Sequence, residues 1–122
     1  MDDSTRYVFS RQQRLLKAAD FKKVFEKSYK SGDRYFTVLA RANGLSQARL
    51  GLAIAKKQMK LAVMRNRVKR LARESFRLHQ HTLAGLDCVV LARQNLADIE
   101  NATLLCSLIR HWRFLAAQCK KS

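Results

Sequence analysis

Residues 56–73 hold the densest group of side chains that could take part in chemistry. Eight cations stand there without an acidic residue among them: Lys56, Lys57, Lys60, Arg65, Arg67, Lys69, Arg70 and Arg73. A solvated helix usually mixes Glu with its Lys and Arg, because like charges four residues apart repel each other by roughly a few tenths of a kcal/mol. The uncompensated run therefore indicates a polyanionic partner, and nucleic acid is the leading candidate.

The charge of the whole chain agrees with that interpretation. Its 122 residues include 25 Lys and Arg against 9 Asp and Glu, a net charge of +16. A membrane partner would need a long apolar span or a basic amphipathic helix with an aromatic-rich face, and the longest unbroken apolar run is only Cys88 to Ala92. The start, Met1-Asp2-Asp3, does not resemble a signal peptide. We therefore predict a cytoplasmic protein with no membrane partner.

Signatures of a protein-borne active site are missing from the sequence. There is no Gly-x-x-x-x-Gly-Lys loop, no Gly-x-Gly-x-x-Gly and no Gly-x-Ser-x-Gly. The cysteines and histidines have neither zinc-ligand nor disulfide spacing; they are Cys88, Cys106, Cys119, His79, His81 and His111. We predict no catalytic residue, no metal site and no tightly bound cofactor on the protein.

The first half of the chain predicts one helix and two strands. An extended arm covers residues 1–17, and Phe21, Val24 and Phe25 then have helical spacing up to a break at Gly32-Asp33. Alternating patterns predict strands from Arg34 to Arg41 and from Arg49 to Ala55. Because only a short turn at Asn43-Gly44 separates them, we expect these strands to pair as a hairpin.

The second half predicts a basic helix, a buried strand and a final helix. Residues 64–80 have helical spacing, with their cations gathered in an arc of about 140°. Leu61 to Val63 is a possible extra strand, Leu86 to Ala92 a buried one, and Asn101 to Gln118 a helix. The predicted order is α-β-β-(β)-α-β-α, an α+β fold with one sheet of about four strands. We expect a single domain over residues 1–122, with residues 1–12 and 119–122 flexible.

The type of nucleic acid follows from the elements that carry the cations. Arginine can fork onto two phosphate oxygens, and that geometry suits either RNA or DNA. The usual DNA-reading helix belongs to a helix-turn-helix or a zinc finger, and neither pattern is present. A basic helix beside a sheet with aromatic residues fits folded or single-stranded RNA better.

The residues around the basic helix resemble those of a known family. The run Ala55-Lys56-Lys57, followed by Val63-Met64-Arg65-Asn66-Arg67-Val68-Lys69-Arg70-Leu71-Ala72-Arg73-Glu74, resembles the signature of the bacterial ribonuclease P protein component. Asp20 to Phe25, Arg34-x-Phe36, Arg49 to Leu52 and Ala92-Arg93 follow the pattern too. The resemblance spans roughly residues 11–118.

The resemblance implies a function as a subunit. Members of this family assist a catalytic RNA that removes the 5′ leader from precursor tRNA, while the RNA holds the Mg²⁺ ions. It implies a fold similar to domain 2 of ribosomal protein S5, with a left-handed β-α-β crossover. The implied contacts with the catalytic RNA are Lys56, Lys57, Lys60, Arg65, Asn66, Arg67, Lys69, Arg70 and Arg73. The implied cleft for the leader contains Phe21, Phe25, Phe36 and Leu39.

Alternatives remain open at this point. Phe21 and Phe25, four residues apart, pack into a core more often than they stack on bases. Three other functions are compatible with the charge: a ribosomal protein, a nucleoid or regulatory DNA-binding protein, and a self-sufficient nuclease. The sequence predicts no protein oligomer.

Overall fold

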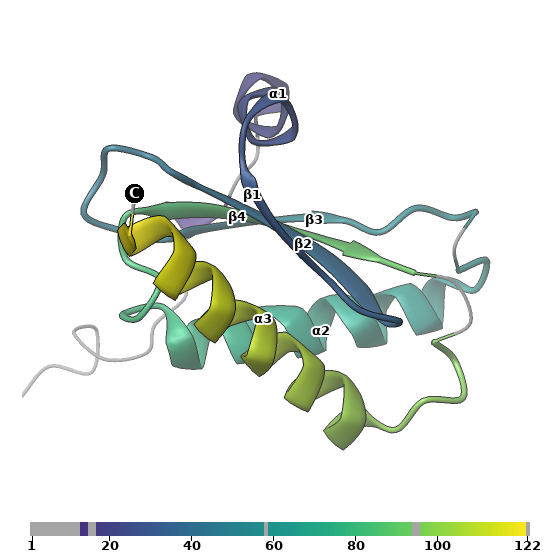
Figure 1. Ribbon diagram of the computed structural model, residues 1–122. Helices are drawn as coiled ribbons and strands as arrows, with labels where there is room; N and C mark the ends of the chain where they lie inside the picture. Colours follow the sequence, from purple (N-terminus) through teal and green to yellow (C-terminus); the bar gives the residue numbers. More distant parts are fainter. Residues whose placement is uncertain (1–12, 15–16, 58, 94–95, 122) are drawn as a thin grey trace, which may run out of the picture.

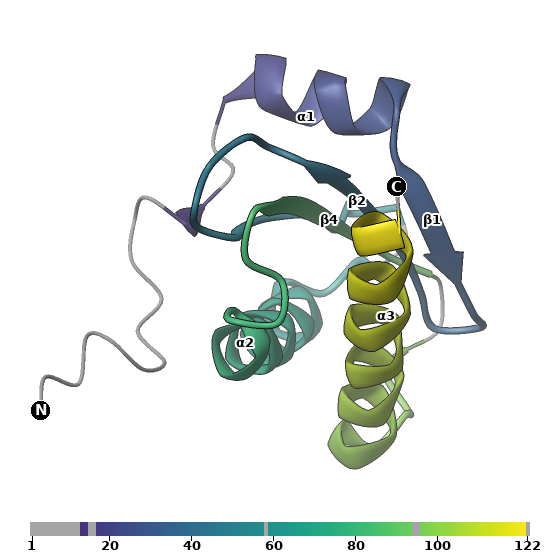
Figure 2. The same ribbon diagram turned by 60° about the vertical axis from the view of Figure 1, so that its left-hand side comes forward.

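The computed structural model describes residues 13–14, 17–57, 59–93 and 96–121. A four-stranded sheet separates two helical layers (Figure 1). Helix α1 (Ala18–Glu26) covers one face of the sheet, while α2 (Ala62–His79) and α3 (Asn101–Lys121) pack together on the other (Figure 2). The predicted α+β class with one sheet is confirmed.

The sheet has the strand order β1-β2-β4-β3. Its strands are β1 (Tyr29–Gly32), β2 (Phe36–Ala42), β3 (Arg49–Ala53) and β4 (Leu86–Ala92). Strand β4 is central and almost entirely buried, as its continuous apolar run predicts. It pairs antiparallel with β2 and parallel with β3, so the chain from β3 through α2 to β4 forms a β-α-β crossover.

The predicted hairpin is wrong. Strands β2 and β3 are consecutive in the chain, but β4 lies between them and pairs with both. The turn signal at Asn43-Gly44 is real, since Gly44 has φ 73°, which glycine adopts without strain. The local sequence does not reveal that a strand more than 30 residues later inserts between the two.

Two further expectations about strands need correction. The helix predicted up to Gly32 ends at Glu26, and residues 29–32 form the edge strand β1. Its sequence, Tyr-Lys-Ser-Gly, is mostly exposed and lacks the apolar alternation of a half-buried strand. The possible strand at Leu61 to Val63 is absent, because α2 already begins at Ala62.

The main core lies between the sheet and the pair α2 and α3. Phe36, Val38 and Ala40 of β2 point into it and are fully buried. Phe76 of α2 meets Trp112 of α3 edge to face, with ring centroids 5.8 Å apart. The Trp112 Nε1–H donates to Ser75 Oγ at 2.8 Å, so the buried indole has its hydrogen-bond partner.

A polar cluster fastens the β1–β2 turn to α3. Asp33 accepts hydrogen bonds from the backbone N–H groups of Tyr35 (2.8 Å) and Phe36 (2.9 Å) and from Ser107 Oγ (2.5 Å). His111 Nε2 lies 3.2 Å from Asp33 Oδ2. Burial opposes ionisation of Asp33, but these hydrogen bonds outweigh it and lower its pKa to about 2.

None of the helices in the described residues is long and apolar enough to cross a membrane.

Candidate nucleic-acid interface

The outward side of α2 carries a row of polar and cationic side chains. Val68, Ala72, Ser75 and Phe76 face the core, so the opposite side of the helix faces solvent. A shallow depression on that side is lined by Asn66, Arg70, Arg73, Glu74 and Arg77. We call this set the α2 outer face.

Two arginines of the α2 outer face have no competing partner among the described residues. Arg70 and Arg73 are exposed, and within the described part of the chain the guanidinium group of neither forms a hydrogen bond or an ion pair. Glu74, the only acid of the set, is paired with Arg77 one turn away, and that hydrogen bond lowers the pKa of Glu74. Arg70 and Arg73 are therefore available to an external anion.

Arg65 points back toward its own chain instead. Its Nη1 donates to the backbone carbonyl groups of Met59 (2.9 Å) and Lys60 (2.8 Å). These bonds hold the turn that precedes α2 against the first turn of the helix. Arg65 therefore shapes the backbone beside the basic face, and part of its hydrogen-bonding capacity is already used.

Arg67 is even more fully engaged within the protein. Its guanidinium donates to the carbonyl groups of Leu96 (3.3 Å), Ala97 (3.4 Å) and Ile99, and to Asn101 Oδ1 at 2.7 Å. It thereby ties α2 to the segment that leads into α3. Because these acceptors occupy its donors, the structure separates Arg67 from the α2 outer face.

The remaining cations of the predicted set lie on the turn before α2 and on the flank of the helix. Lys56, Lys57 and Lys60 are exposed on the turn before the helix, and Lys69 is half-buried on its flank. The side-chain ammonium group of none of the four has a hydrogen bond or ion pair to another described residue. They extend the positive surface from the α2 outer face to the helix start.

Three of the four residues predicted for the leader cleft, Phe21, Phe25 and Leu39, lie on the α1 side of the sheet. Val24 of α1 and Val89 of β4 form a small buried cluster there, and Phe21, Leu39 and Ala53 pack against it. Phe25, one turn after Phe21, stays outside this cluster and is 50% exposed. Phe21 therefore supports the helix on the sheet, whereas Phe25 offers an aromatic surface to solvent.

Phe36 does not belong with the other three members of that set. It is fully buried in the main core, on the face of the sheet that α2 and α3 cover. Alternation along β2 puts Phe36 and Leu39, three positions apart, on opposite faces. The implied position of Phe36 in the cleft is therefore corrected: Phe36 is a core residue.

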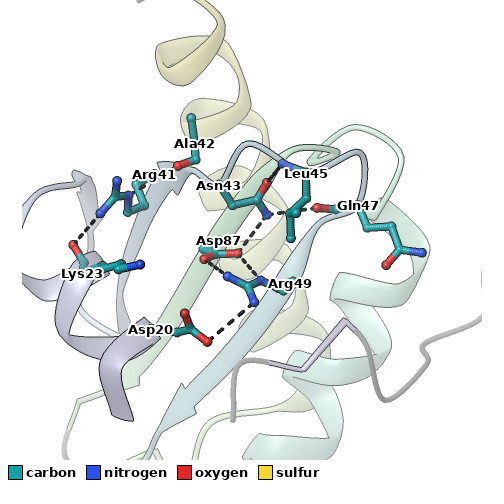
Figure 3. Close-up of polar contacts among 9 residues, drawn as sticks. All are labelled: Asp20, Lys23, Arg41, Ala42, Asn43, Leu45, Gln47, Arg49 and Asp87. Atoms are coloured by element: carbon teal, nitrogen blue, oxygen red, sulfur yellow. Dashed lines mark hydrogen bonds and ion pairs between the residues drawn. The ribbon is translucent and has the colours of Figure 1, made fainter. Parts of the chain in front are cut away.

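An ion-pair network links α1 to the sheet (Figure 3). Arg49 of β3 donates to both carboxylate oxygens of Asp87 in β4, at 2.7 and 2.6 Å. Its Nη1 lies 3.6 Å from Asp20 in the first turn of α1. Asn43 Nδ2 donates to Asp87 Oδ1 at 2.9 Å and so joins the β2–β3 loop to the network.

Two arginines on the α1 side were not among the predicted site residues. Arg41 lies two residues after Leu39 on β2 and therefore on the same face of the sheet. Its Nη1 donates to the Lys23 carbonyl of α1 at 3.3 Å (Figure 3). The guanidinium of Arg93 lies beside Gly32, 3.9 Å from where a Cβ on that residue would stand. The i, i+2 spacing of Leu39 and Arg41 was a signal that could have located Arg41.

Comparison with known proteins identifies the family. The family model for ribonuclease P matches residues 9–116. The chain belongs to the ribonuclease P protein family. The ribonuclease P protein component of Vibrio cholerae is 48% identical over 110 residues, which cover 90% of this chain and 93% of the relative. That of Methylococcus capsulatus is 47% identical over 116 residues, covering 95% and 91%.

Solved structures of ribonuclease P proteins have the same fold as this chain. The RNase P protein of Staphylococcus aureus superposes with a TM-score of 0.77 at 32% identity, covering 84% of this chain and 94% of that one. The RNase P protein of Thermotoga maritima gives a TM-score of 0.74 at 31% identity, covering 83% and 96%. The residues matched by the family model include both the α2 outer face and the α1 side of the sheet.

Proposed function

We propose that this chain is the RNA-binding subunit of a cytoplasmic ribonuclease P, and that its α2 outer face binds the catalytic RNA. The supporting observation is the pair Arg70 and Arg73, exposed and without partners in the described part of the chain. Their forked donors suit phosphate oxygens, and each phosphate neutralised releases counterions from the RNA. Lys56, Lys57 and Lys60 extend this contact toward the helix start.

The 5′ leader of precursor tRNA is the proposed ligand of the α1 side. Phe25 offers a half-exposed aromatic ring on which an unstacked base can lie. Leu39 contributes apolar surface, Phe21 supports the helix, and Arg41 and Arg93 supply charge for leader phosphates. Val24 and Phe21 pack α1 onto Val89 of the sheet, and Arg49, which Asp87 holds in place, lies 3.6 Å from Asp20 of α1. This surface is therefore organised before RNA arrives.

The Mg²⁺ ions of the reaction belong to the RNA in this proposal. Among the described residues, no group of three His, Cys, Asp or Glu side chains could hold a metal ion. Asp20, Asp33, Glu74 and Asp87 are each paired with an arginine or a histidine. These residues do not fit a divalent-ion site, so the protein acts by neutralising phosphates and by positioning the substrate.

Cleavage of precursor tRNA at low Mg²⁺ tests the proposal. Three reactions would contain a bacterial ribonuclease P RNA, this protein, or both. We expect rapid cleavage at the mature 5′ end only when both RNA and protein are present. The protein should stimulate cleavage less when the substrate carries a single-nucleotide leader than when it carries a longer one. Absence of stimulation with an RNA that is active alone at high Mg²⁺ would refute the proposed function. Cleavage by the protein alone would revive the self-sufficient nuclease.

A further inference from the structure

Two largely exposed apolar side chains lie in the chain between the lysines that precede α2 and the cations of α2. Leu61 is 65% exposed and Val63 is 68% exposed, more than any other large hydrophobic residue in the described part of the chain. They flank Ala62, the first residue of α2. Both side chains leave apolar surface in water, and covering that surface with a partner would be favourable. We call them the apolar pair.

The backbone that presents the apolar pair is held in place. Met59, two residues before Leu61, is buried in the main core, and its N–H donates to the Lys56 carbonyl at 3.2 Å. Arg65 clamps the Met59 and Lys60 carbonyl groups from the first turns of α2. Fixing this backbone in advance lowers the entropy lost when the apolar pair docks.

The surroundings of the apolar pair determine the chemistry of its partner. Lys56, Lys57 and Lys60 are exposed just before it, and the first turn of α2 contains no acidic residue. A partner must therefore offer apolar or aromatic surface next to dense negative charge. An RNA strand does so, because each unstacked base has a π-face beside its phosphates.

We propose that the apolar pair packs against an unstacked base of the catalytic RNA, while the neighbouring lysines bind its phosphates. This inference rests on the proposed function and adds to it a contact that the cationic residues do not predict. A second copy of the chain is a poorer occupant, since an interface there would bring two clusters of lysines together.

Affinity for ribonuclease P RNA, measured across a range of salt concentrations, tests the inference. The double variant Leu61→Gln/Val63→Thr keeps side-chain volume but removes apolar surface. We expect it to bind about tenfold more weakly, by loss of transfer free energy. The slope of log affinity against log salt should stay unchanged, because no counterion-releasing contact is lost. Lys60→Gln should instead reduce the magnitude of that slope by about one.

Two control variants test whether a loss of affinity comes from removing apolar surface at Leu61 and Val63 or from any substitution of an exposed apolar residue. Leu61→Met/Val63→Ile retains apolar surface and should bind like the wild type. Leu45→Gln removes an apolar side chain that is 52% exposed on the β2–β3 loop, and it too should leave affinity unchanged. Thermal unfolding of every variant would verify that the fold is intact.

The possible results separate this inference from the proposed function. If the wild type binds the RNA and Leu61→Gln/Val63→Thr binds within twofold of it, the inference is wrong while the proposed function stands. If the wild type does not bind the RNA, the proposed function fails first. Concentration-dependent dimers in sedimentation that disappear in the double variant would assign the apolar pair to a second copy, and would also overturn the inference.

Discussion

At the scale of single residues, the basic motif divides into two kinds of arginine. Arg70 and Arg73 project into solvent, whereas Arg65 and Arg67 donate to backbone carbonyl groups of their own chain. Sequence alone does not distinguish them, because all four have the same charge and lie on one helix. For Arg67 the distinction depends on a tertiary contact with residues 96–101, and for Arg65 it depends on the turn that precedes the helix.

This division predicts opposite effects for two alanine variants. Arg70→Ala should weaken RNA affinity by about 1–2 kcal/mol and leave stability unchanged, because it removes a charge-assisted contact to the ligand. Arg67→Ala should lower the free energy of unfolding by about 1–3 kcal/mol, because carbonyl groups lose a charged donor. Urea denaturation and RNA binding on both variants would check this. Equal loss of RNA affinity with unchanged stability in Arg67→Ala would contradict the assignment.

The cysteines also differ at this scale. Cys88 is fully buried in β4, and burial strongly raises the pKa of its thiol, while Cys106 is exposed on α3. Because the thiolate is the reactive form, a thiol reagent should label Cys106 quickly in the native protein and Cys88 only after unfolding. Mass spectrometry of labelled peptides would show it, with Cys106→Ser as the control. Rapid native labelling of Cys88 would mean that β4 is not buried as described.

At the scale of elements, the position of α1 depends on few contacts. Val24 and Phe21 provide its apolar anchor, and Arg49 links its first turn to the sheet through Asp20 and Asp87. The two ion pairs are unequal. The bond to Asp87 is bidentate and largely buried, whereas Asp20 lies 3.6 Å away with a more exposed carboxylate.

Substitutions in this network should reflect that inequality. Arg49→Met should destabilise the protein by about 3 kcal/mol, because it leaves the Asp87 carboxylate buried without its cation. Asp20→Asn should cost less than about 1 kcal/mol, because a partly exposed ion pair contributes little. Equilibrium unfolding in urea measures both. Equal costs for the two variants would show that the buried pair is not the main support of the network.

Prediction from the sequence succeeded for elements with strong local patterns. Strand β4 has the predicted bounds, and α2 starts two residues earlier and ends one residue earlier than expected. The failures have non-local causes: β1 is a polar edge strand that β2 stabilises, and β4 inserts where a hairpin was expected. For the candidate site, local pattern located the cations, but only the tertiary structure revealed that Phe36 lies in the core and that Arg67 donates to the segment before α3.

At the scale of the whole molecule, the cluster around Asp33 links stability to pH. The pKa of Asp33 is lowered from 3.8 to about 2, so the native state binds its proton less readily than the unfolded chain does. The stabilisation is therefore fully present above about pH 4 and is lost as pH falls through about 2. Since Asp33 is partly exposed, solvent screening limits this contribution to about 1–2 kcal/mol.

The variant Asp33→Asn makes this contribution measurable. It should lower the free energy of unfolding by about 1–2 kcal/mol at pH 7, and the difference from wild type should shrink between about pH 4 and pH 2. Urea titrations at several pH values provide the test. A difference that does not depend on pH would indicate that the charge of Asp33 contributes nothing.

The net charge of +16 makes a matched comparison necessary. Any removal of positive charge weakens attraction to RNA somewhat, wherever the charge stood. Arg113 and Lys120 on α3 are exposed cations outside the α2 outer face, and the charged group of neither has a hydrogen bond or ion pair to another described residue. The double variant Arg113→Ala/Lys120→Ala therefore removes the same number of positive charges as Arg70→Ala/Arg73→Ala, but from a different surface of the protein.

The most direct test of the central claim is the affinity of these two double variants for ribonuclease P RNA at one fixed salt concentration. We predict that Arg70→Ala/Arg73→Ala binds about 30- to 1000-fold more weakly than the wild type, at about 1–2 kcal/mol for each lost contact. Arg113→Ala/Lys120→Ala should lose no more than a few-fold. Equal losses in the two variants would contradict the claim, because general attraction to the polyanion, and not the α2 outer face, would then explain binding.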